Sequence, residues 1–385
     1  MKKIILSILL VAATFTAMAQ PMEQREQSDA CITSAESQQR KNESQIKVEY
    51  SETVELMAIL AHIADYSSFN ADLAGQYSKD INAWFAPYKQ HKAVILGQDI
   101  REKYGIGYEK VSNMAIHLDI EKGKLRLIGD RSELSNGWQN VDLDDFVDKL
   151  NQFYKDTRFH EFFEQHRSFY EEGIKSYETN VMPYFHPEWY ARFYGTEATE
   201  QFRIIIGFAH GDTNNGVSRQ LPGQSREVFS IMGYVLNPNT GKPRWDAAIL
   251  IHEFNHSFVN PLLDNSANAA LIEKIGQKLF QWSQPEMESQ AYTDWRIVIN
   301  ESIVRAAVFV YMKDNGLINR GTGDFLFEEM WRRGFHWTPE LVETLHHYAA
   351  NRDKYPTLND YYPEIARCLT KYIEKEVERI KKALQ

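Results

Sequence analysis

The 385-residue sequence is poor in cysteine and has no excess of basic residues. Its two cysteines, Cys31 and Cys368, are too few for a disulfide framework and lack the C-x-x-C spacing of a thiolate zinc site, so at most one disulfide is expected. Lys and Arg number 43 against 53 Asp and Glu, and no basic run occurs outside the N-terminus. Nucleic acid is therefore not expected as a partner. With 43% hydrophobic and 25% charged residues, the composition is that of a globular protein.

The N-terminus has the pattern of an export signal. Lys2 and Lys3 precede an apolar run that begins at Ile4, and residues 17–19 (AMA) supply the small side chains that signal peptidase needs. The run is shorter than a membrane-spanning helix and no stop-transfer charges follow it. We therefore predict a signal peptide over residues 1–19 and a periplasmic or extracellular protein without stable membrane insertion. Gln20 follows the cleavage site where a lipoprotein would have cysteine, which disfavours a lipid anchor.

The remainder divides into three parts. Residues 20–45 are rich in Gln, Ser and Glu and are predicted to be a disordered linker, because they bury too little apolar surface to offset the cost of ordering. Residues 46–195 are predicted to be an N-terminal helical region, with a hairpin around residues 114–128 that turns at Lys122-Gly123. Residues 196–385 are predicted to form a zincin-like catalytic region. We expect the last two parts to fold together, because neither alone covers all its apolar faces.

The third part begins with β-rich sequence and continues as helix. Residues 202–208 and 228–235 predict two buried strands, separated by a loop over 210–224. After a turn at 237–241 come predicted helices near 267–282, 294–313, 338–350 and 359–383, besides the motif helix described next. The predicted fold class is α+β, mainly α-helical, with a small β-sheet that precedes the motif helix.

An H-E-x-x-H motif, His252-Glu253-Phe254-Asn255-His256, lies in an apolar helical run that Asp246 can cap and Pro261 should end. Four residues are just over one helical turn, so the two imidazoles share a face and can converge on one Zn²⁺. Glu253 would then lie beside the metal, where a carboxylate can take a proton from water and pass it to a leaving amine. The alternative is a pair of hydrogen-bonded core histidines.

A catalytic zinc site usually has three protein ligands. Glu301 is the best candidate for the third, because it shares a predicted inward stripe with Ile297 and Val304. An inward carboxylate needs a cation, which would be zinc or else Arg305, one turn further on. Weaker candidates, in more polar or proline-containing sequence, are Glu273, Glu286 and Glu288.

The spacing of His252, Glu253 and His256, with the later Asn300-Glu301 pair, resembles the gluzincin branch of the zinc metallopeptidases, whose third ligand is a Glu on a later helix. The strings HEFNHSFVNP and NESIVRA are also similar to an uncharacterised family of exported Bacteroidota proteins known only as a domain of unknown function. The second resemblance covers about residues 50–370 and brings no established substrate, whereas the gluzincin resemblance implies Zn²⁺ as cofactor and a peptide or protein as substrate. One departure is Arg305, which stands where thermolysin-like enzymes have an acid that orients the first histidine.

Two further parts of a site are expected. In gluzincins a strand before the motif helix forms the edge along which substrate lies, and the resemblance assigns that role to residues 228–235 or 204–208. A donor to the developing oxyanion should come from outside the ligands. His347 or Tyr348, within the predicted C-terminal helices, is predicted to be that donor, although paired histidines on an amphipathic helix are as often at the surface.

Three classes of function stay open. The first is an exported zinc metallopeptidase-like hydrolase, in which water activated by Glu253 attacks a peptide carbonyl. The others are a zinc hydrolase of a non-peptide bond and an exported binding or structural protein with a non-catalytic metal site. The intact Glu253 favours an enzyme, because structural zinc needs no base. The acidic charge predicts poor cleavage of acidic peptides, unless the cleft is basic around Arg203, Arg219 or Arg305.

Overall fold

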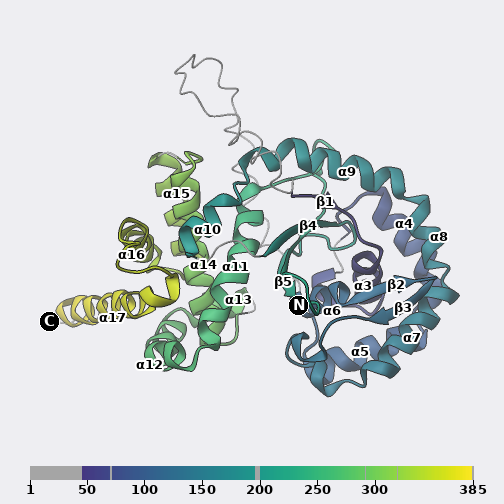
Figure 1. The fold of residues 1–385 in the computed structure, drawn as a ribbon, viewed down its shortest axis with the longest axis horizontal. Coiled ribbons are helices and arrows are strands. Elements are labelled where there is room, and N and C mark those ends of the chain that lie inside the picture. The colour runs from purple at the N-terminus through teal and green to yellow at the C-terminus, as the bar shows by residue number, and fades with distance from the viewer. Residues whose placement is uncertain (1–45, 70–71, 196–199, 291, 319, 384–385) are drawn as a thin grey trace, which may run out of the picture.

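The computed structural model describes residues 46–385 except 70–71, 196–199, 291, 319 and 384–385. The predicted signal peptide, the predicted linker and Cys31 lie outside the described residues. The fold is mainly helical α+β, with a small mixed sheet that precedes the second group of helices (Figure 1). Among the described residues, no helix combines the length and the hydropathy that crossing a bilayer requires.

In the described part of the chain, six strands form a four-stranded sheet and a separate hairpin. They are β1 (Val48–Glu49), β2 (Leu118–Glu121), β3 (Lys124–Leu127), β4 (Gln201–Gly207), β5 (Asn215–Arg219) and β6 (Glu227–Gly233). The predicted hairpin is confirmed as β2 and β3, and its turn residues Lys122 and Gly123 both have positive φ, at 51° and 75°. Such a two-residue turn matches the twist of the strands it joins.

The order of the sheet is β1-β4-β6-β5. The first three strands are parallel, and β5 runs antiparallel to β6. The two predicted strands are confirmed as β4 and β6, but each has neighbours on both sides, so the prediction that one of them is the substrate-binding edge is wrong. The edge next to β6 is β5, which lies inside the sequence predicted to be a loop. Since β1 pairs with β4, the sheet joins both predicted regions.

Helices cover the sheet and extend the molecule away from it (Figure 1). Those of the N-terminal region are α3 (Glu52–Ile63), α4 (Gln76–Phe85), α5 (Lys92–Tyr104), α6 (Glu109–Ile116), α7 (Leu143–Asp156), α8 (Phe159–Gln165), α9 (Arg167–Asn180) and α10 (Glu188–Tyr194). Those that follow the sheet are α11 (Ala247–Asp264), α12 (Ser266–Trp282), α13 (Gln284–Ser289), α14 (Trp295–Asp314), α15 (Arg320–Arg332), α16 (Thr338–Ala350) and α17 (Leu358–Ala383). The four predicted helices after the motif agree with α12, α14, α16 and α17 to within one residue, whereas α13 and α15 were not predicted.

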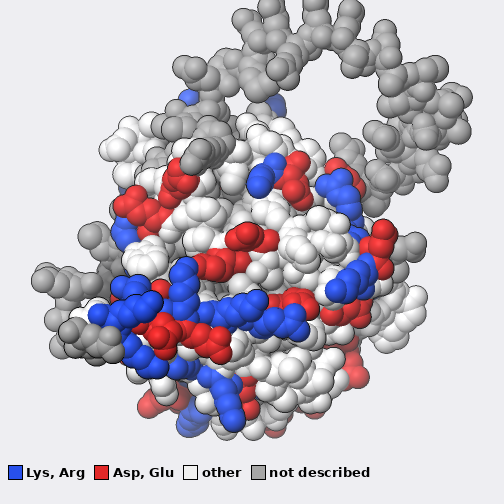
Figure 2. Space-filling model, turned by 90° about the vertical axis from the view of Figure 1, so that its left-hand side faces the viewer, with Lys and Arg blue, Asp and Glu red and all other residues white. Residues whose placement is uncertain are grey.

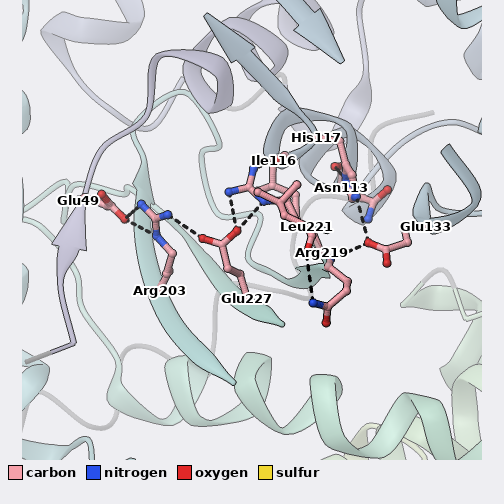
Figure 3. A network of polar contacts seen from close by, with 10 residues as sticks. Glu49, Asn113, Ile116, His117, Glu133, Arg203, Arg219, Leu221 and Glu227 are labelled. Carbon is pink, nitrogen blue, oxygen red and sulfur yellow. Dashed lines mark hydrogen bonds and ion pairs between the residues drawn. The ribbon is translucent and has the colours of Figure 1, made fainter. Parts of the chain in front are cut away.

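A row of alternating charges crosses the four-stranded sheet, and we call Glu49, Arg203, Glu227 and Arg219 the charge ladder (Figure 3). Arg203 Nε donates to Glu49 at 2.7 Å and its Nη1 donates to Glu227 at 2.9 Å. Arg219 Nε donates to the other oxygen of Glu227 at 2.7 Å. Each strand contributes one member, so the ladder ties all four strands together and gives the buried Glu227 a partner on each side.

A second buried carboxylate, Glu55 of α3, fixes the chain just beyond β4. Its oxygens accept hydrogen bonds from Tyr77 Oη at 2.7 Å and from the backbone N–H groups of Phe208 and Ala209 at 2.6 and 3.1 Å. The side chain is fully buried, and burial raises the pKa of Glu55 to about 7 despite these hydrogen bonds. Helix α3 is thereby joined to the carboxyl end of β4.

The face formed by the C-terminal helices carries charges of both signs (Figure 2). Blue and red side chains alternate across it, and no large area has a single sign. On α17 the pairing is local, since Arg367 bonds Glu364, Arg379 bonds Glu376 at 2.8 Å and Lys381 bonds Glu378 at 3.0 Å. The negative net charge is therefore not concentrated on this face.

Candidate metal site

Helix α11 presents the motif, and its ends are fixed by specific side chains. Asp246 accepts a hydrogen bond from Ala248 N at 2.8 Å, which confirms the predicted N-cap. Pro261 does not end the helix, which continues to Asp264. Proline has no N–H to bond the carbonyl of Ser257, and Arg226 Nη2 donates to that carbonyl instead at 3.4 Å. The helix therefore stays regular through the motif.

The other faces of α11 are held by aromatic packing against α10 and β4. Phe254 lies edge-on to Phe202, with ring centres 4.9 Å apart. Asn255 is fully buried and accepts a hydrogen bond from Tyr194 Oη at 2.8 Å. These contacts leave the face with His252 and His256 pointing away from the aromatic core, toward α14.

His252, His256 and Glu301 converge on one point. The two Nε2 atoms lie 3.1 Å apart, and Glu301 Oε1 lies 3.2 Å from His256 Nε2. Glu301 Oε2 lies 3.6 Å from His252 Nε2, and all the ligand atoms fall within 4.8 Å of one another. Glu301 is 7% exposed. We call these three residues the triad, and the structure brings them together as the sequence predicts.

The triad fits a metal ion better than it fits a set of hydrogen bonds. The two Nε2 atoms face each other at 3.1 Å, where a hydrogen bond can use only one of them as a donor. Tetrahedral zinc with ligands at about 2.0–2.1 Å places neighbouring ligand atoms roughly 3.3 Å apart, close to the spacings here. His256 Nδ1 lies 3.1 Å from Asn260 Oδ1, an arrangement in which Nδ1–H donates and the Nε2 lone pair stays free for a metal. The sequence analysis missed Asn260, although it lies one turn after His256.

Charge and burial set opposite pKa shifts within the triad. Burial lowers the pKa of His252 well below its ordinary value, and the positive charges of Arg305 and Arg333 lower it further. Burial also disfavours charge on His256, but its hydrogen bond to Glu301 raises its pKa to about 9. For Glu301, Arg305 and the two histidines outweigh burial and hold the pKa well below its usual range. The carboxylate is therefore ionised and able to bind a cation.

The side chain of Glu253 lies where α11 packs against the edge strand β5. It is 9% exposed, and burial raises its pKa to about 7 although the backbone N–H of Gly216 opposes the rise. Strand and helix approach closely here, because a Cβ atom on Gly216 would lie 2.1 Å from the carbonyl oxygen of Glu253. Only glycine fits at this position of β5. The triad, Glu253 and β5 thus form one compact group.

A family described as a domain of unknown function (DUF4932) matches residues 46–368. The chain belongs to the DUF4932 family. No curated protein and no solved structure matches it. The matched residues contain the sheet, the triad and Glu253, so the DUF4932 domain includes the whole candidate site. The predicted resemblance to a domain of unknown function is confirmed, whereas the gluzincin relationship stays a prediction.

In this DUF4932 chain, Arg305 and Tyr292 surround the outer oxygen of Glu301. Arg305 Nη2 lies 2.9 Å from Glu301 Oε2 and 3.0 Å from Tyr292 Oη. The guanidinium stacks on Phe335, 4.8 Å from the ring centre. Arg305 thus pairs with Glu301 as the alternative interpretation of the sequence proposed, but it holds Oε2 and leaves Oε1 directed at His256. Sequence analysis missed Tyr292, which lies in the irregular segment before α14.

The structure does not bring the two predicted oxyanion donors to the triad. His347 Nδ1 lies 2.9 Å from Tyr361 Oη, between α16 and α17. Tyr348 is fully buried, and its ring lies edge-on to Phe193 at 5.5 Å. No hydrogen bond or ion pair in the described part of the chain joins either residue to the triad. The weaker ligand candidates Glu273 and Glu288 are exposed, and Glu286 is likewise outside the group of residues that could hold a metal ion.

Proposed function

We propose that this DUF4932 protein is an exported zinc-dependent hydrolase of the metallopeptidase type. The observation that supports it most is the convergence of two imidazole nitrogens and one carboxylate beside a buried glutamate that is not part of the triad. Three protein ligands and a separate base are the composition of a catalytic zinc site, whereas structural zinc has four ligands. Zn²⁺ in the triad would polarise a water molecule and a substrate carbonyl.

Glu253 is the proposed general base and acid. It follows His252 directly, so a carboxylate is held beside the triad without taking part in it. A pKa of about 7 suits both a general base and a general acid, because near neutral pH the group can take a proton from water and give it to a leaving amine. The close contact of Gly216 with the Glu253 backbone keeps the carboxylate at the border of β5.

Tyr292 is the proposed donor to the oxyanion, in place of His347 and Tyr348. Its hydroxyl accepts from Arg305 Nη2 at 3.0 Å, so its phenolic hydrogen is available to donate, either to Glu301 or to an oxyanion. Arg305 in turn lies 2.9 Å from Glu301 Oε2, so the hydroxyl is held next to the triad by a residue that is itself fixed. A donor fixed before the reaction stabilises developing charge without the cost of reorganisation.

The decisive experiment uses the mature chain from residue 20, purified and analysed for metal. We expect about one zinc per chain and chelator-sensitive cleavage of an unbiased peptide library. Glu253→Gln should keep the zinc and the fold but lower hydrolysis at least about a hundredfold, because an amide cannot accept the water proton. Glu288→Gln, at an exposed position, is the matched control and should behave like the wild type.

Each opposite outcome identifies another class of function. A zinc-loaded wild type that cleaves no peptide but hydrolyses esters or amides of small molecules would favour a non-peptide substrate. Zinc binding without any hydrolysis would favour an exported binding protein. Absence of zinc from the purified chain, with no uptake on titration, would overturn the proposal.

A further inference from the structure

A second arginine, Arg333, lies close to Arg305 in the fold. Arg333 follows the last residue of α15, and its carbonyl accepts a hydrogen bond from Gln290 Nε2 at 2.9 Å. Gln290 lies two residues before Tyr292, the proposed donor, and Phe335, two residues after Arg333, stacks against the guanidinium of Arg305. These contacts place Arg333 beside the group formed by Tyr292, Arg305 and Glu301.

The guanidinium of Arg333 is fixed on one side only. Its Nε donates to Glu329 Oε1 at 2.9 Å, and the side chain is 17% exposed. None of the described residues provides a hydrogen-bond acceptor for its two Nη groups, and neither Nη is buried. Glu329 is itself held from its other oxygen by Arg332 Nη1 at 3.0 Å. Arg332 also pairs with Glu328 at 3.4 Å, so Glu329 orients Arg333 and leaves both Nη groups of Arg333 without an acceptor among the described residues.

The other arginines considered in the sequence analysis are already paired. Arg203 and Arg219 belong to the charge ladder, where Glu49 and Glu227 neutralise them. Arg305 is paired with Glu301. Arg333 is different, since it has Nη donors that reach solvent and since its charge acts on His252. Free, fixed guanidinium donors are suited to a carboxylate, which they bind through two parallel hydrogen bonds.

We propose that Arg333 binds a carboxylate of the substrate next to the triad, so that the protein prefers peptides with an acidic group near the bond it hydrolyses. This inference rests on the proposed function and adds the class of substrate. It reverses the expectation from the net charge, because a local guanidinium a few ångströms from the bound group outweighs a diffuse negative field that salt screens. The carboxylate belongs to an Asp or Glu side chain or to the free C-terminus of the peptide.

Binding to the zinc-loaded Glu253→Gln protein tests this without relying on turnover. The probes are three fluorescein-labelled octapeptide libraries: one with a central Glu and an amidated C-terminus, one with a central Gln and an amidated C-terminus, and one with a central Gln and a free C-terminus. Fluorescence anisotropy gives the affinity of each. We expect at least one carboxylate library to bind about tenfold more tightly than the neutral library, the size of one charge-assisted contact.

The variants assign that preference to Arg333. Arg333→Gln should abolish it, Arg333→Lys should restore part of it, and Arg332→Gln should leave it unchanged, since Arg332 shares Glu329 but is the more exposed of the two arginines. Preference for the central Glu or for the free C-terminus tells which carboxylate is bound.

Three results would overturn the inference. One is equal binding of all three libraries, and another is an equal loss with Arg332→Gln and Arg333→Gln. The third is a loss of affinity for the neutral library as large as that for the acidic ones. If the wild type cleaves peptides and the preference is missing, only the role of Arg333 fails. If no library binds and none is cleaved, the proposed function fails with it.

Discussion

Two clusters of buried charge in this molecule are built differently. In the charge ladder Glu227 is held by an arginine on each side, and every ladder side chain has a partner of opposite charge (Figure 3). In the triad two imidazole nitrogens lie 3.1 Å apart, where only one of them can donate, and Glu301 is shared between Arg305 and the two histidines. The ladder is complete without a ligand. The triad sets two imidazole nitrogens face to face, an arrangement that a bound cation would complete.

The largest expected effect is the loss of zinc affinity when Glu301, the carboxylate of the triad, is removed. Glu301→Ala leaves two ligands, and since zinc binding to a protein site is worth about 10–16 kcal/mol, one ligand in four accounts for roughly 2.5–4 kcal/mol, or about a few hundredfold in affinity. Competition with a chromophoric chelator measures this. Glu273→Ala and Glu288→Ala are the controls, and loss of zinc in either of them with retention in Glu301→Ala would show that the third ligand was assigned incorrectly.

Removing the acid of the ladder should destabilise the fold and spare the metal. Glu227→Gln leaves the buried Arg219 without its partner, whereas Arg203 keeps Glu49, so we expect the free energy of unfolding to fall by about 3 kcal/mol. Denaturation with urea measures the change, and zinc affinity measured on the folded variant should stay within about twofold. A large loss of zinc affinity would show that the two clusters are coupled.

Tyr292 and Tyr348 are the two tyrosines to compare as donors to the oxyanion. Tyr292→Phe should lower kcat about a hundredfold with little change in KM, because it removes a donor that acts on the developing oxyanion. Tyr348→Phe should change kcat little, since its hydroxyl is buried and lacks a partner. A larger loss of kcat in Tyr348→Phe than in Tyr292→Phe would show that Tyr348 is the oxyanion donor, as the sequence analysis predicted.

Glu55 provides a third case, a buried carboxyl whose hydrogen-bond donors are all uncharged. Its folded pKa of about 7 exceeds the ordinary value of 4.5, so its favourable contribution is complete at low pH and is lost as the pH rises through 7. Between pH 5 and 8 the wild type should therefore lose on the order of 2 kcal/mol that Glu55→Gln does not lose. Urea denaturation at several pH values tests this, with the exposed Glu273→Gln as control. Parallel pH profiles of the wild type and Glu55→Gln would contradict it.

Much of the motif region could be predicted from sequence because its signals are local. The cap at Asp246 and the spacing of His252 and His256 depend on one helix only. Glu301 was found through an inward stripe, although that argument was only partly right. Helix α14 is buried on most sides, and Ile297, placed on the same stripe, is 38% exposed. The choice of Glu301 was nevertheless right, because a carboxylate in a helix buried on most sides needs a cation whichever side it faces.

What could not be predicted depends on contacts between distant segments. Strand β5 reads NGVSR, without apolar alternation, and is a strand because it pairs with β6. Pro261 stays within α11 because Arg226, far away in sequence, replaces the missing hydrogen bond. Tyr292 and Arg333 lie at chain positions with no periodic pattern, and only the packing around Phe335 brings them to the triad. The features that sequence analysis missed therefore surround the triad, whereas the triad itself could be predicted.

The pairing of β1 with β4 has a consequence for the order of assembly. Val48 is in register with Ile204, so the two strands cannot meet until the ribosome has released everything between them. Contacts so distant in sequence form slowly. Glu301 lies almost a hundred residues further on, so the triad is completed only when nearly the whole domain is available to fold. On the proposed function, zinc is therefore bound late, after both regions of the chain have come together.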